Sequence, residues 1–311
     1  MDNGLMIETK DLTKTFGDFT AVDSISLTVQ KGIIHGFVGP NGAGKTTTMK
    51  MLVGAIRCTG GEGYVNGHAI GSIPARQLIG YSPEQSLFYK GMVASDYLAY
   101  MARICGVKRA EAREKALELL DWLDLGKFSE NKVDGFSAGM KQRLSLAQAL
   151  IHEPELLILD EPTANMDPTG RLSILDKLRE LSRERQVTIF LSSHILSELE
   201  QVVDNMTMID EGRIAVEGKI AELGKRFSGN HFLLKTTSNE AILAAISDKG
   251  LFGENWIDNE DFIHLISDGG ANLRKAIMEA ITKTGADLEH LSEERASLQD
   301  IYRKTMEMEK E

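Results

Sequence analysis

Apolar and polar positions along the first part of the chain predict a series of β-strands followed by a helix. Within residues 5–30 the two kinds of side chain alternate, as expected for antiparallel strands with one buried face. Residues 33–38 form a short apolar run that ends at Gly39, which is typical of a buried strand. Residues 46–53 have the pattern of the first turns of a helix, and residues 60–67 that of a further strand between turns.

The middle of the chain changes from strand patterns to helix patterns and back. Ser95 is a suitable N-cap for a helix, and residues 108–123 carry apolar side chains at helical spacing. Buried strands return at residues 155–160 and 187–191. Because strands and helices alternate, we expect an α/β core with parallel strands. The helical stretch, about residues 86–152, is then an insertion between two halves of the sheet.

After about Gly224 the pattern is that of a small α+β appendage with an acidic surface. Strand patterns occur at residues 231–236, 262–266 and 288–291, and helix patterns at residues 241–246, 272–281 and 298–306. We therefore predict two domains, residues 5–224 and residues 225–311.

Composition narrows the possible environments and partners. The net charge of −11 over 311 residues argues against a broad nucleic-acid-binding face, which requires clustered Lys and Arg. The two cysteines, Cys58 and Cys105, lack metal-ligand spacing and fit a reducing cytosol. No apolar stretch is long enough to span a bilayer, and the N-terminus lacks a secretory-signal pattern. We expect a cytoplasmic protein whose membrane-spanning part, if it has one, belongs to another chain.

Residues 39–46 fit the phosphate-binding pattern G-x-x-x-x-G-K-[ST], between the predicted buried strand and its helix. Successive backbone N–H groups of such a loop, together with the helix start, form a site for phosphates. Lys45 can then reach the terminal phosphates, and the Thr46 hydroxyl can bind magnesium. The alternative is a glycine-rich turn that matches by chance. The expected nucleotide-binding residues are Gly39, Pro40, Asn41, Gly42, Ala43, Gly44, Lys45, Thr46 and Thr47.

Two carboxylates follow the predicted strand at residues 155–160. Asp160 at the end of a parallel strand faces the crevice in which ligands bind, and it is suited to hold magnesium. Glu161 can polarise the water that attacks the terminal phosphate. Surface carboxylates at a turn are the alternative, and the phosphate loop favours a hydrolysis site instead.

A second anion-binding helix start is predicted at residues 136–143. Ser137 can cap the apolar helix that follows, and the small residues around it leave backbone N–H groups accessible. One chain does not need two phosphate clamps unless the second serves a nucleotide bound to another chain.

These motifs together resemble the ATP-binding cassette (ABC) transporter ATPase family over residues 5–220. Residues 39–46 match its Walker A loop and residues 156–161 its Walker B strand. Residues 136–143 resemble the signature Leu-Ser-Gly-Gly-Gln, with Ser137 and Gly139 retained. Three positions depart from that signature: Phe136, Ala138 and Met140. The resemblance implies a P-loop NTPase fold with a RecA-like core, an antiparallel β subdomain and a helical insertion, and it implies ATP and Mg²⁺ as cofactors.

Further residues are assigned by the same resemblance. Residues 164–167 are similar to the D-loop, and His194 to the switch histidine that hydrogen-bonds the terminal phosphate. Phe16 occupies the place of the aromatic residue that stacks on adenine. For the Gln loop, which in the family contacts magnesium and the membrane subunit, the sequence offers two candidate residues. Alignment register favours Glu84 for its role, whereas chemistry favours Gln85 as the metal ligand.

The resemblance implies an ATP-binding and ATP-hydrolysing subunit that works with separate transmembrane permease subunits at the inner face of the cell membrane. Two copies, or this chain and a related ATPase, would pack head to tail, so that Ser137 and Gly139 of one chain face the ATP of the other. Residues 86–97 are the expected permease-docking surface, and no nucleic-acid partner is expected.

Residues 297–302 are similar to the tail of exporter-type members, which favours export of a drug, lipid, peptide or ion. The alternative is a soluble ABC ATPase that acts on ribosomes or DNA, but the single cassette and acidic charge argue against it. A third alternative, a nucleotide-gated binding module without turnover, conflicts with the presence of Glu161.

Overall fold

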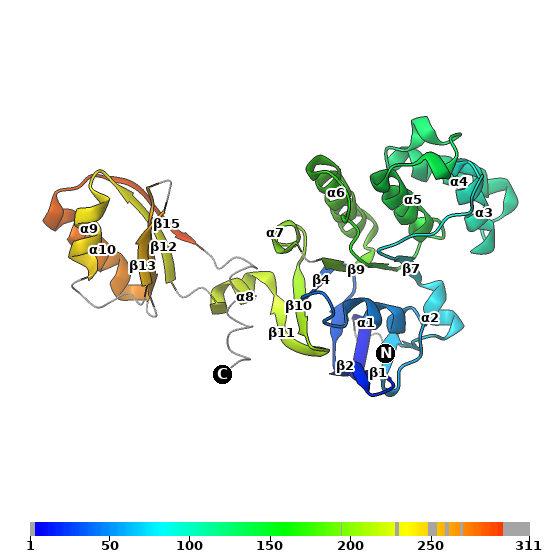
Figure 1. Cartoon of the computed structure of the whole chain (residues 1–311), viewed down its shortest axis with the longest axis horizontal. Coiled ribbons are helices and arrows are strands. Elements are labelled where there is room, and N and C mark those ends of the chain that lie inside the picture. The colour runs from blue at the N-terminus through cyan, green and yellow to red at the C-terminus, as the bar shows by residue number, and fades with distance from the viewer. Residues whose placement is uncertain are drawn as a thin grey trace. The chain divides into compact units, whose positions relative to one another are not determined.

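The computed structural model describes residues 4–193, 195–227, 230–247, 254–258, 261–267 and 270–294. Contacts divide the chain into two compact units, Met1–Lys219 and Ile220–Glu311, here called the N-terminal and C-terminal units (Figure 1). The boundary predicted at Gly224 falls inside helix α8 (Ile220–Phe227). Among the described helices, none combines the length and apolar character needed to cross a membrane.

A six-stranded sheet forms the centre of the N-terminal unit, in the order β11-β10-β4-β9-β8-β7. Five neighbouring strands are parallel, and β11 pairs antiparallel to β10 at the edge. The strands are β4 (Ile34–Val38), β7 (Ile79–Ser82), β8 (Leu156–Leu159), β9 (Thr188–Ser193), β10 (Asn205–Asp210) and β11 (Arg213–Lys219). Every residue of β4, β8 and β9 is buried, which explains their continuous apolar runs.

A second, antiparallel sheet lies in the same unit and shares its core. It contains β1 (Leu5–Phe16), β2 (Phe19–Ile25), β3 (Thr28–Gln30), β5 (Gly60–Val65) and β6 (His68–Ala69). Its inward side chains, such as Ile7 and Val29, pack in one cluster with Met49 of α1 (Lys45–Leu52) and Phe190 of β9. The alternation in residues 5–30 therefore identified antiparallel strands correctly, because one face of each strand is buried.

Helices α3 (Ala94–Ile104), α4 (Arg109–Trp122) and α5 (Ala138–Leu150) lie between β7 and β8 in the sequence (Figure 1). The prediction that Ser95 caps the first of them is wrong, because this helix begins at Ala94 and Ser95 lies buried in its first turn. The backbone N–H groups of Ala94 and Ser95 donate to the carbonyls of Asn131 and Ser129. A packed neighbouring segment therefore supplies the acceptors that a capping side chain would provide.

The remaining long helix of the N-terminal unit, α6 (Pro168–Arg185), runs between β8 and β9 in the sequence. Asp167 caps its start, where Oδ2 accepts a hydrogen bond from the N–H of Gly170 at 3.3 Å. A short helix, α7 (Leu196–Leu199), follows β9, and α2 (Ile73–Gln77) precedes β7. Helix α6 thus connects the carboxyl edge of the sheet to its amino edge.

The C-terminal unit has the element order β-α-β-β-α-β. Its elements are β12 (Asn230–Thr236), α9 (Asn239–Ser247), β13 (Glu254–Ile257), β14 (Ile263–Ser267), α10 (Gly270–Thr284) and β15 (Leu288–Glu294). The sheet order is β13-β14-β12-β15, with antiparallel pairs throughout. Alternate strand residues such as Phe232 and Leu265 pack against Ile242 and Ile277 of the helices.

Most segments predicted for this unit correspond to observed elements. The predicted helix at residues 298–306 lies outside the described residues, and the short strand β13 was not predicted.

Candidate nucleotide site

A cavity of about 540 Å³ lies at the carboxyl ends of β4, β7 and β8 and is here called the nucleotide cavity. Parallel sheets commonly bind ligands at this edge, where the loops after the strands converge. The lining residues come from the β1–β2 hairpin, the phosphate loop and the loops after β7 and β8. They are Phe19, Ala21, Asn41, Gly42, Gly44, Lys45, Thr46, Thr47, Glu84, Asp160, Glu161 and Ala164.

Close packing around the phosphate loop explains two of its glycines. A Cβ atom on Gly39 would lie 2.1 Å from the carbonyl oxygen of Ile209. Gly44, which immediately precedes α1, has a φ of 105°, and a Cβ there would lie 2.5 Å from the carbonyl oxygen of Ala21. The loop can therefore take this shape only with glycine at both positions.

Lys45 is nearly buried, with 7% of its surface exposed, and its ammonium group is held by the loop itself. Nζ donates to the carbonyl oxygens of Gly39 at 2.7 Å and Pro40 at 3.1 Å. Burial lowers the pKa of Lys45, and the nearby carboxylates of Glu161 and Asp160 oppose that shift. The cation is thus fixed beside the place that the loop offers to phosphates.

Ser192, at the end of β9, connects the two carboxylate residues that follow β8. Its Oγ donates to Asp160 Oδ1 at 2.8 Å and accepts from the backbone N–H of Glu161 at 3.0 Å. Asp160 is only 1% exposed, and its Oδ2 is buried with no hydrogen-bond partner among the described residues. Buried carboxylate oxygens are normally paired, so Oδ2 is available for a ligand that the structure lacks.

Glu161 has an unusual backbone conformation. Its φ is 51°, in the left-handed region, which costs a residue with a Cβ atom free energy of order 1–3 kcal/mol. The side chain is 8% exposed and lines the nucleotide cavity close enough to Lys45 for its charge to influence that pKa. Strained residues of this kind gather at functional sites, where the surrounding packing maintains them.

The Gln-loop alternatives are separated by their positions. Glu84 lines the nucleotide cavity, and its carboxylate is among the charges that raise the pKa of Lys45. Gln85, the residue expected to bind metal, is exposed and does not line the cavity. Of the two residues, only Glu84 lines the nucleotide cavity.

The two aromatic residues of the β1–β2 hairpin also differ in position. Phe16, the expected adenine-stacking residue, is half exposed, and Lys14 Nζ lies 4.7 Å from its ring centroid. Phe16 does not line the nucleotide cavity, whereas Phe19 does. The two residues pair directly across the hairpin in register. Sequence analysis missed Phe19, although a second aromatic residue two positions beyond Gly17 could have indicated it.

The predicted signature forms a helix start outside the nucleotide cavity. Ser137 caps α5, where its Oγ accepts from the N–H of Met140 at 3.3 Å, as predicted. A Cβ on Gly139 would lie 3.6 Å from Met166 Cε, so this helix start contacts the loop after β8. Neither Ser137 nor Gly139 lines the cavity that contains Lys45. His194 lies outside the described residues.

The family model of the ABC transporter domain matches residues 22–164. An ABC transporter ATP-binding protein of Bacillus subtilis, YxlF, is 33% identical over 97% of this chain and 99% of its own length. The bacitracin transport ATP-binding protein BcrA of Bacillus licheniformis is 43% identical over 71% of this chain and 72% of its own. The daunorubicin/doxorubicin resistance ATP-binding protein DrrA of Streptomyces peucetius is 36% identical over 74% and 70%, respectively.

Solved structures agree with these matches. An ATP-binding subunit of an ABC transporter superposes with a TM-score of 0.65 and 28% identity, over 71% of this chain and 93% of its own. A dimeric ATP-binding cassette bound to ADP and phosphate superposes with a TM-score of 0.64 and 23% identity, over 69% of this chain and 99% of its own. The predicted fold of a P-loop ABC cassette is thereby confirmed. The chain belongs to the ATP-binding proteins of the ABC transporter family.

Proposed function

We propose that this chain hydrolyses ATP with Mg²⁺ in the nucleotide cavity and thereby powers export through separate permease subunits. ATP binding and hydrolysis are the activities of its family. The observation that best supports the assignment to this cavity is the arrangement around Ser192. One hydroxyl positions both Asp160 and Glu161 beside the buried cation of Lys45.

The charges of the nucleotide cavity suit a triphosphate with its metal ion. Lys45 and the N–H groups of the phosphate loop would bind the phosphates. The unpaired Oδ2 of Asp160 and the hydroxyl of Thr46 offer the hard oxygen ligands that magnesium prefers, with the phosphates supplying others. Bound magnesium would supply positive charge to the phosphate oxygens. Glu84 is proposed to contribute near this position in place of Gln85, because it lines the nucleotide cavity.

Glu161 is the proposed residue that orients and polarises the attacking water. Its backbone is held by Ser192, so its carboxylate projects from a fixed point into the cavity. His194 is proposed to hydrogen-bond the terminal phosphate, and Phe16 or Phe19 to stack on the adenine. Catalysis would depend on positioning and charge, because phosphoryl transfer to water needs no covalent enzyme intermediate.

A second cassette is proposed to complete the site. Ser137 and Gly139 lie at the start of a helix of 13 residues, and neither lines the nucleotide cavity of its own chain. Ser137 is exposed, so the helix start is accessible to a phosphate on another chain. A head-to-tail homodimer, or a heterodimer with a related ATPase, would bring each signature to the partner's nucleotide.

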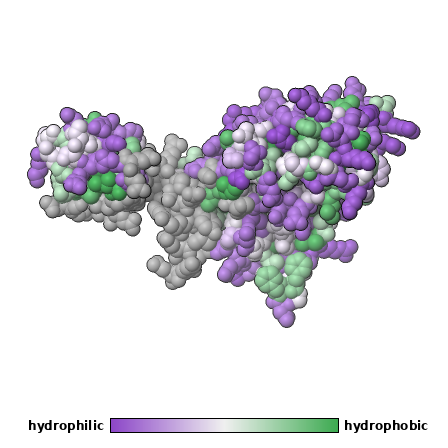
Figure 2. Space-filling view, turned by 45° about the horizontal axis from the view of Figure 1, so that its top comes forward, coloured by the Kyte–Doolittle hydropathy of each residue, from purple (hydrophilic) through white to green (hydrophobic). Residues whose placement is uncertain are grey.

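Exposed apolar side chains after β7 support a permease-docking surface. Leu87 is 94% exposed, and Tyr89, Tyr100 and Ile104 are also exposed. The ring of Tyr89 lies 5.9 Å from that of Tyr100, in an edge-on arrangement. The face of the N-terminal unit drawn in Figure 2 is mainly hydrophilic, with separate hydrophobic patches. Clustered exposed apolar groups mark interaction sites, and a permease would hold the chain at the inner membrane face.

Export is proposed from the names of the relatives. They include proteins of bacitracin transport and of daunorubicin/doxorubicin resistance, and no name among them points to ribosomes or DNA. A drug-like compound is therefore the favoured cargo. The exporter-like tail at residues 297–302 lies outside the described residues.

Substitution of Glu161 tests the assignment. Glu161→Gln should keep ATP affinity within about threefold and lower the turnover of ATP by about 10²–10⁴-fold, the usual contribution of a general base. ATP and Mg²⁺ should then hold the variant as a dimer, measured by light scattering and by binding of a fluorescent ATP analogue. Glu62→Gln, at an exposed position of β5 outside the nucleotide cavity, is the matched control. Undiminished turnover in Glu161→Gln would remove the proposed role of this residue.

A further inference from the structure

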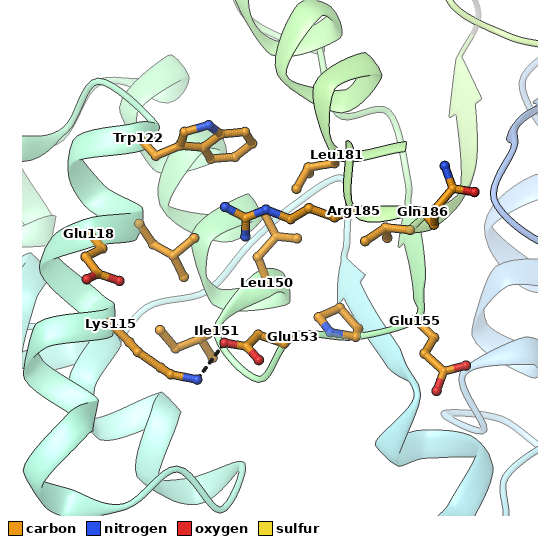
Figure 3. A pocket seen from close by; sticks show the side chains of 13 residues that line it. Lys115, Glu118, Trp122, Leu150, Ile151, Glu153, Glu155, Leu181, Arg185 and Gln186 are labelled. Carbon is orange, nitrogen blue, oxygen red and sulfur yellow. Dashed lines mark hydrogen bonds and ion pairs between the residues drawn. The ribbon is translucent and has the colours of Figure 1, made fainter. Parts of the chain in front are cut away.

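A second cavity, of about 490 Å³, lies at the amino edge of the same parallel sheet and is here called the amino-edge cavity (Figure 3). Its walls are α4, the connection from α5 to β8, and the end of α6 with the connection to β9. Its volume is within the range of drug-sized ligand sites. The lining residues are Lys115, Glu118, Leu119, Trp122, Leu150, Ile151, Glu153, Pro154, Glu155, Leu181, Arg185, Gln186 and Val187.

Most of the lining is apolar, and one large side chain is held firmly in place. The indole N–H of Trp122 donates to Glu180 Oε1 at 3.1 Å, and Lys177 Nζ lies 5.1 Å from the ring centroid. Leu119, Leu150 and Leu181 contribute further apolar surface. Figure 3 shows the aliphatic side chains between Trp122 at one end and Glu153 at the other. Such a wall favours a ligand with an apolar body.

Two opposite charges of the lining, those of Glu118 and Arg185, are held by no ion pair or hydrogen bond among the described residues. Lys115 and, more weakly, the charge of Arg185 lower the pKa of Glu153. Lys115 pairs with Glu153 at 2.6 Å, and Glu155 accepts from Asn66 Nδ2 at 3.1 Å. In contrast, the side chains of Glu118 and Arg185 form no ion pair or hydrogen bond within the part of the chain that the structure describes.

These two charges come from opposite walls of the amino-edge cavity. Glu118 projects from α4, whereas Arg185 extends from the end of α6 toward α4, between Trp122 and Leu150 (Figure 3). The guanidinium group can bind a carboxylate through two parallel hydrogen bonds, and the carboxylate of Glu118 can accept from an ammonium group.

We propose that the amino-edge cavity binds a small zwitterion with an apolar body, either a hydrophobic amino acid or a short apolar peptide. Its carboxylate meets Arg185, its ammonium group meets Glu118, and its side chains pack against Trp122 and the leucines. The apolar wall supplies affinity, and the two unpaired charges of opposite sign supply selectivity for a ligand that carries both.

Three elements around this cavity extend toward the carboxyl edge of the sheet, and one of them, β8, ends at the nucleotide cavity. Helix α6 ends at Arg185 and begins beside Asp167, a span of 18 residues or about 27 Å. Helix α5 ends at Leu150 and starts after its N-cap residue Ser137, which lies outside the nucleotide cavity. Strand β8 starts after Glu155 and ends before Asp160. Because these elements are rigid, a ligand that joins α4 to the end of α6 acts on the residues at their other ends. We therefore expect binding at the two cavities to be coupled.

Binding is measured first, without nucleotide. The chain has two tryptophans, so Trp256→Phe leaves Trp122 as the sole indole reporter. The probes are leucine, phenylalanine and leucyl-leucine, together with the N-acetyl and C-terminal amide forms of each. A zwitterion should change Trp122 fluorescence and release heat in calorimetry, whereas each capped form should bind about tenfold more weakly or worse. The comparison of amino acids with the dipeptide identifies the size of the ligand.

Variants then assign the two contacts. Arg185→Gln should weaken the binding of probes with a free carboxylate about tenfold and leave the binding of the amide forms unchanged. Glu118→Gln should weaken the binding of probes with a free ammonium group about tenfold and leave the binding of the N-acetyl forms unchanged. Arg183→Gln and Glu114→Gln, exposed neighbours on the same helices, are the matched controls. Failure of every zwitterion to bind at millimolar concentration, or equal binding of capped and free forms, overturns the proposal.

Coupling is measured by repeating the titration in Glu161→Gln with saturating ATP. The dissociation constant of the bound probe should change by about fivefold or more, because coupling between sites is reciprocal. An unchanged dissociation constant would refute the coupling while leaving the binding site itself in place.

Discussion

The two cavities of the N-terminal unit lie at opposite edges of one parallel sheet and hold their charges differently. In the nucleotide cavity, Lys45 and Asp160 are almost fully buried and are fixed by the backbone or by Ser192. In the amino-edge cavity, Glu118 and Arg185 are exposed and unpaired among the described residues. Preorganised charge suits catalysis, which gains when groups need not rearrange. Exposed, flexible charge suits recognition of a ligand that arrives with its own charges.

The largest effect is expected when a Cβ atom is added to the phosphate loop at the carboxyl edge of the sheet. Gly44→Ala would place a Cβ atom 2.5 Å from the carbonyl oxygen of Ala21, on a backbone with a φ of 105°. Because backbone cannot move aside cheaply, we expect loss of detectable ATP binding and a destabilisation of about 1–3 kcal/mol. Equilibrium binding of a fluorescent ATP analogue and urea unfolding measure the two effects.

Gly135→Ala is the control for this change, because a Cβ there meets no atom within 4 Å and its φ is not positive. Normal ATP affinity in Gly44→Ala would contradict the claim that the phosphate loop has no room for a Cβ atom at this position.

A smaller effect is expected when the charges of the nucleotide cavity lose their support. Ser192→Ala removes the donor to Asp160 and the acceptor for the N–H of Glu161. Residues that support metal-binding carboxylates typically contribute 10–100-fold to activity, so we expect a decrease in kcat of about that size. Steady-state ATPase assays at several Mg²⁺ concentrations should show a raised requirement for the metal.

Ser193→Ala is the matched control, because its hydroxyl accepts only from the N–H of Ile195 among the described contacts. Equal kcat values for the two variants would mean that Ser192 does not position the carboxylates.

The smallest effect is expected from protonation of a buried histidine in the parallel sheet, between the two cavities. His35 on β4 is fully buried, its Nε2 lies 2.8 Å from Thr207 Oγ1, and burial lowers its pKa to about 3. The imidazole of His35 therefore binds a proton less readily in the folded state than in the unfolded state, where a histidine has a pKa near 6.5. The contribution of His35 to stability is complete above pH 6.5 and is lost as the pH falls toward 3.

Below pH 6.5 we expect His35 to reduce the free energy of unfolding by up to about 1.4 kcal/mol per pH unit. Urea unfolding of the wild type and of His35→Gln, between pH 7 and pH 5, measures this slope. His68→Gln, on exposed β6, is the control. Identical slopes in the wild type and in His35→Gln would mean that the sheet interior tolerates the imidazolium ion.

Local sequence patterns predicted the parts of the fold that depend on neighbouring residues. The phosphate loop at residues 39–46 and the carboxylates after β8 could be recognised because their spacing is fixed within one strand–loop unit. Ser137 was recognised as a helix cap for the same reason. Ser95 was wrongly predicted as a cap because the helix start is stabilised by a distant segment. The backbone N–H of Ser95 donates to the carbonyl oxygen of Ser129, which a local sequence pattern cannot include.

Features built from distant residues were not accessible. Ser192 meets Asp160 across 32 positions of sequence, and only strand order brings their ends together. The roles of Phe16 and Phe19 depend on which way a hairpin turns, and those of Glu84 and Gln85 on the path of a loop. The amino-edge cavity combines residues from α4 to β9, so no single segment indicates it.

The hydroxyl of Ser192 has one further consequence, which arises from the direction of its hydrogen bonds. A hydroxyl has a single proton, and here the N–H of Glu161 donates to the oxygen while that proton goes to Asp160. Donation therefore runs one way, from peptide to hydroxyl to carboxylate, and each bond polarises the next. The N–H of Glu161 thereby orients the Ser192 hydroxyl so that its proton points to Oδ1 of Asp160, which leaves Oδ2 as the oxygen available to a ligand.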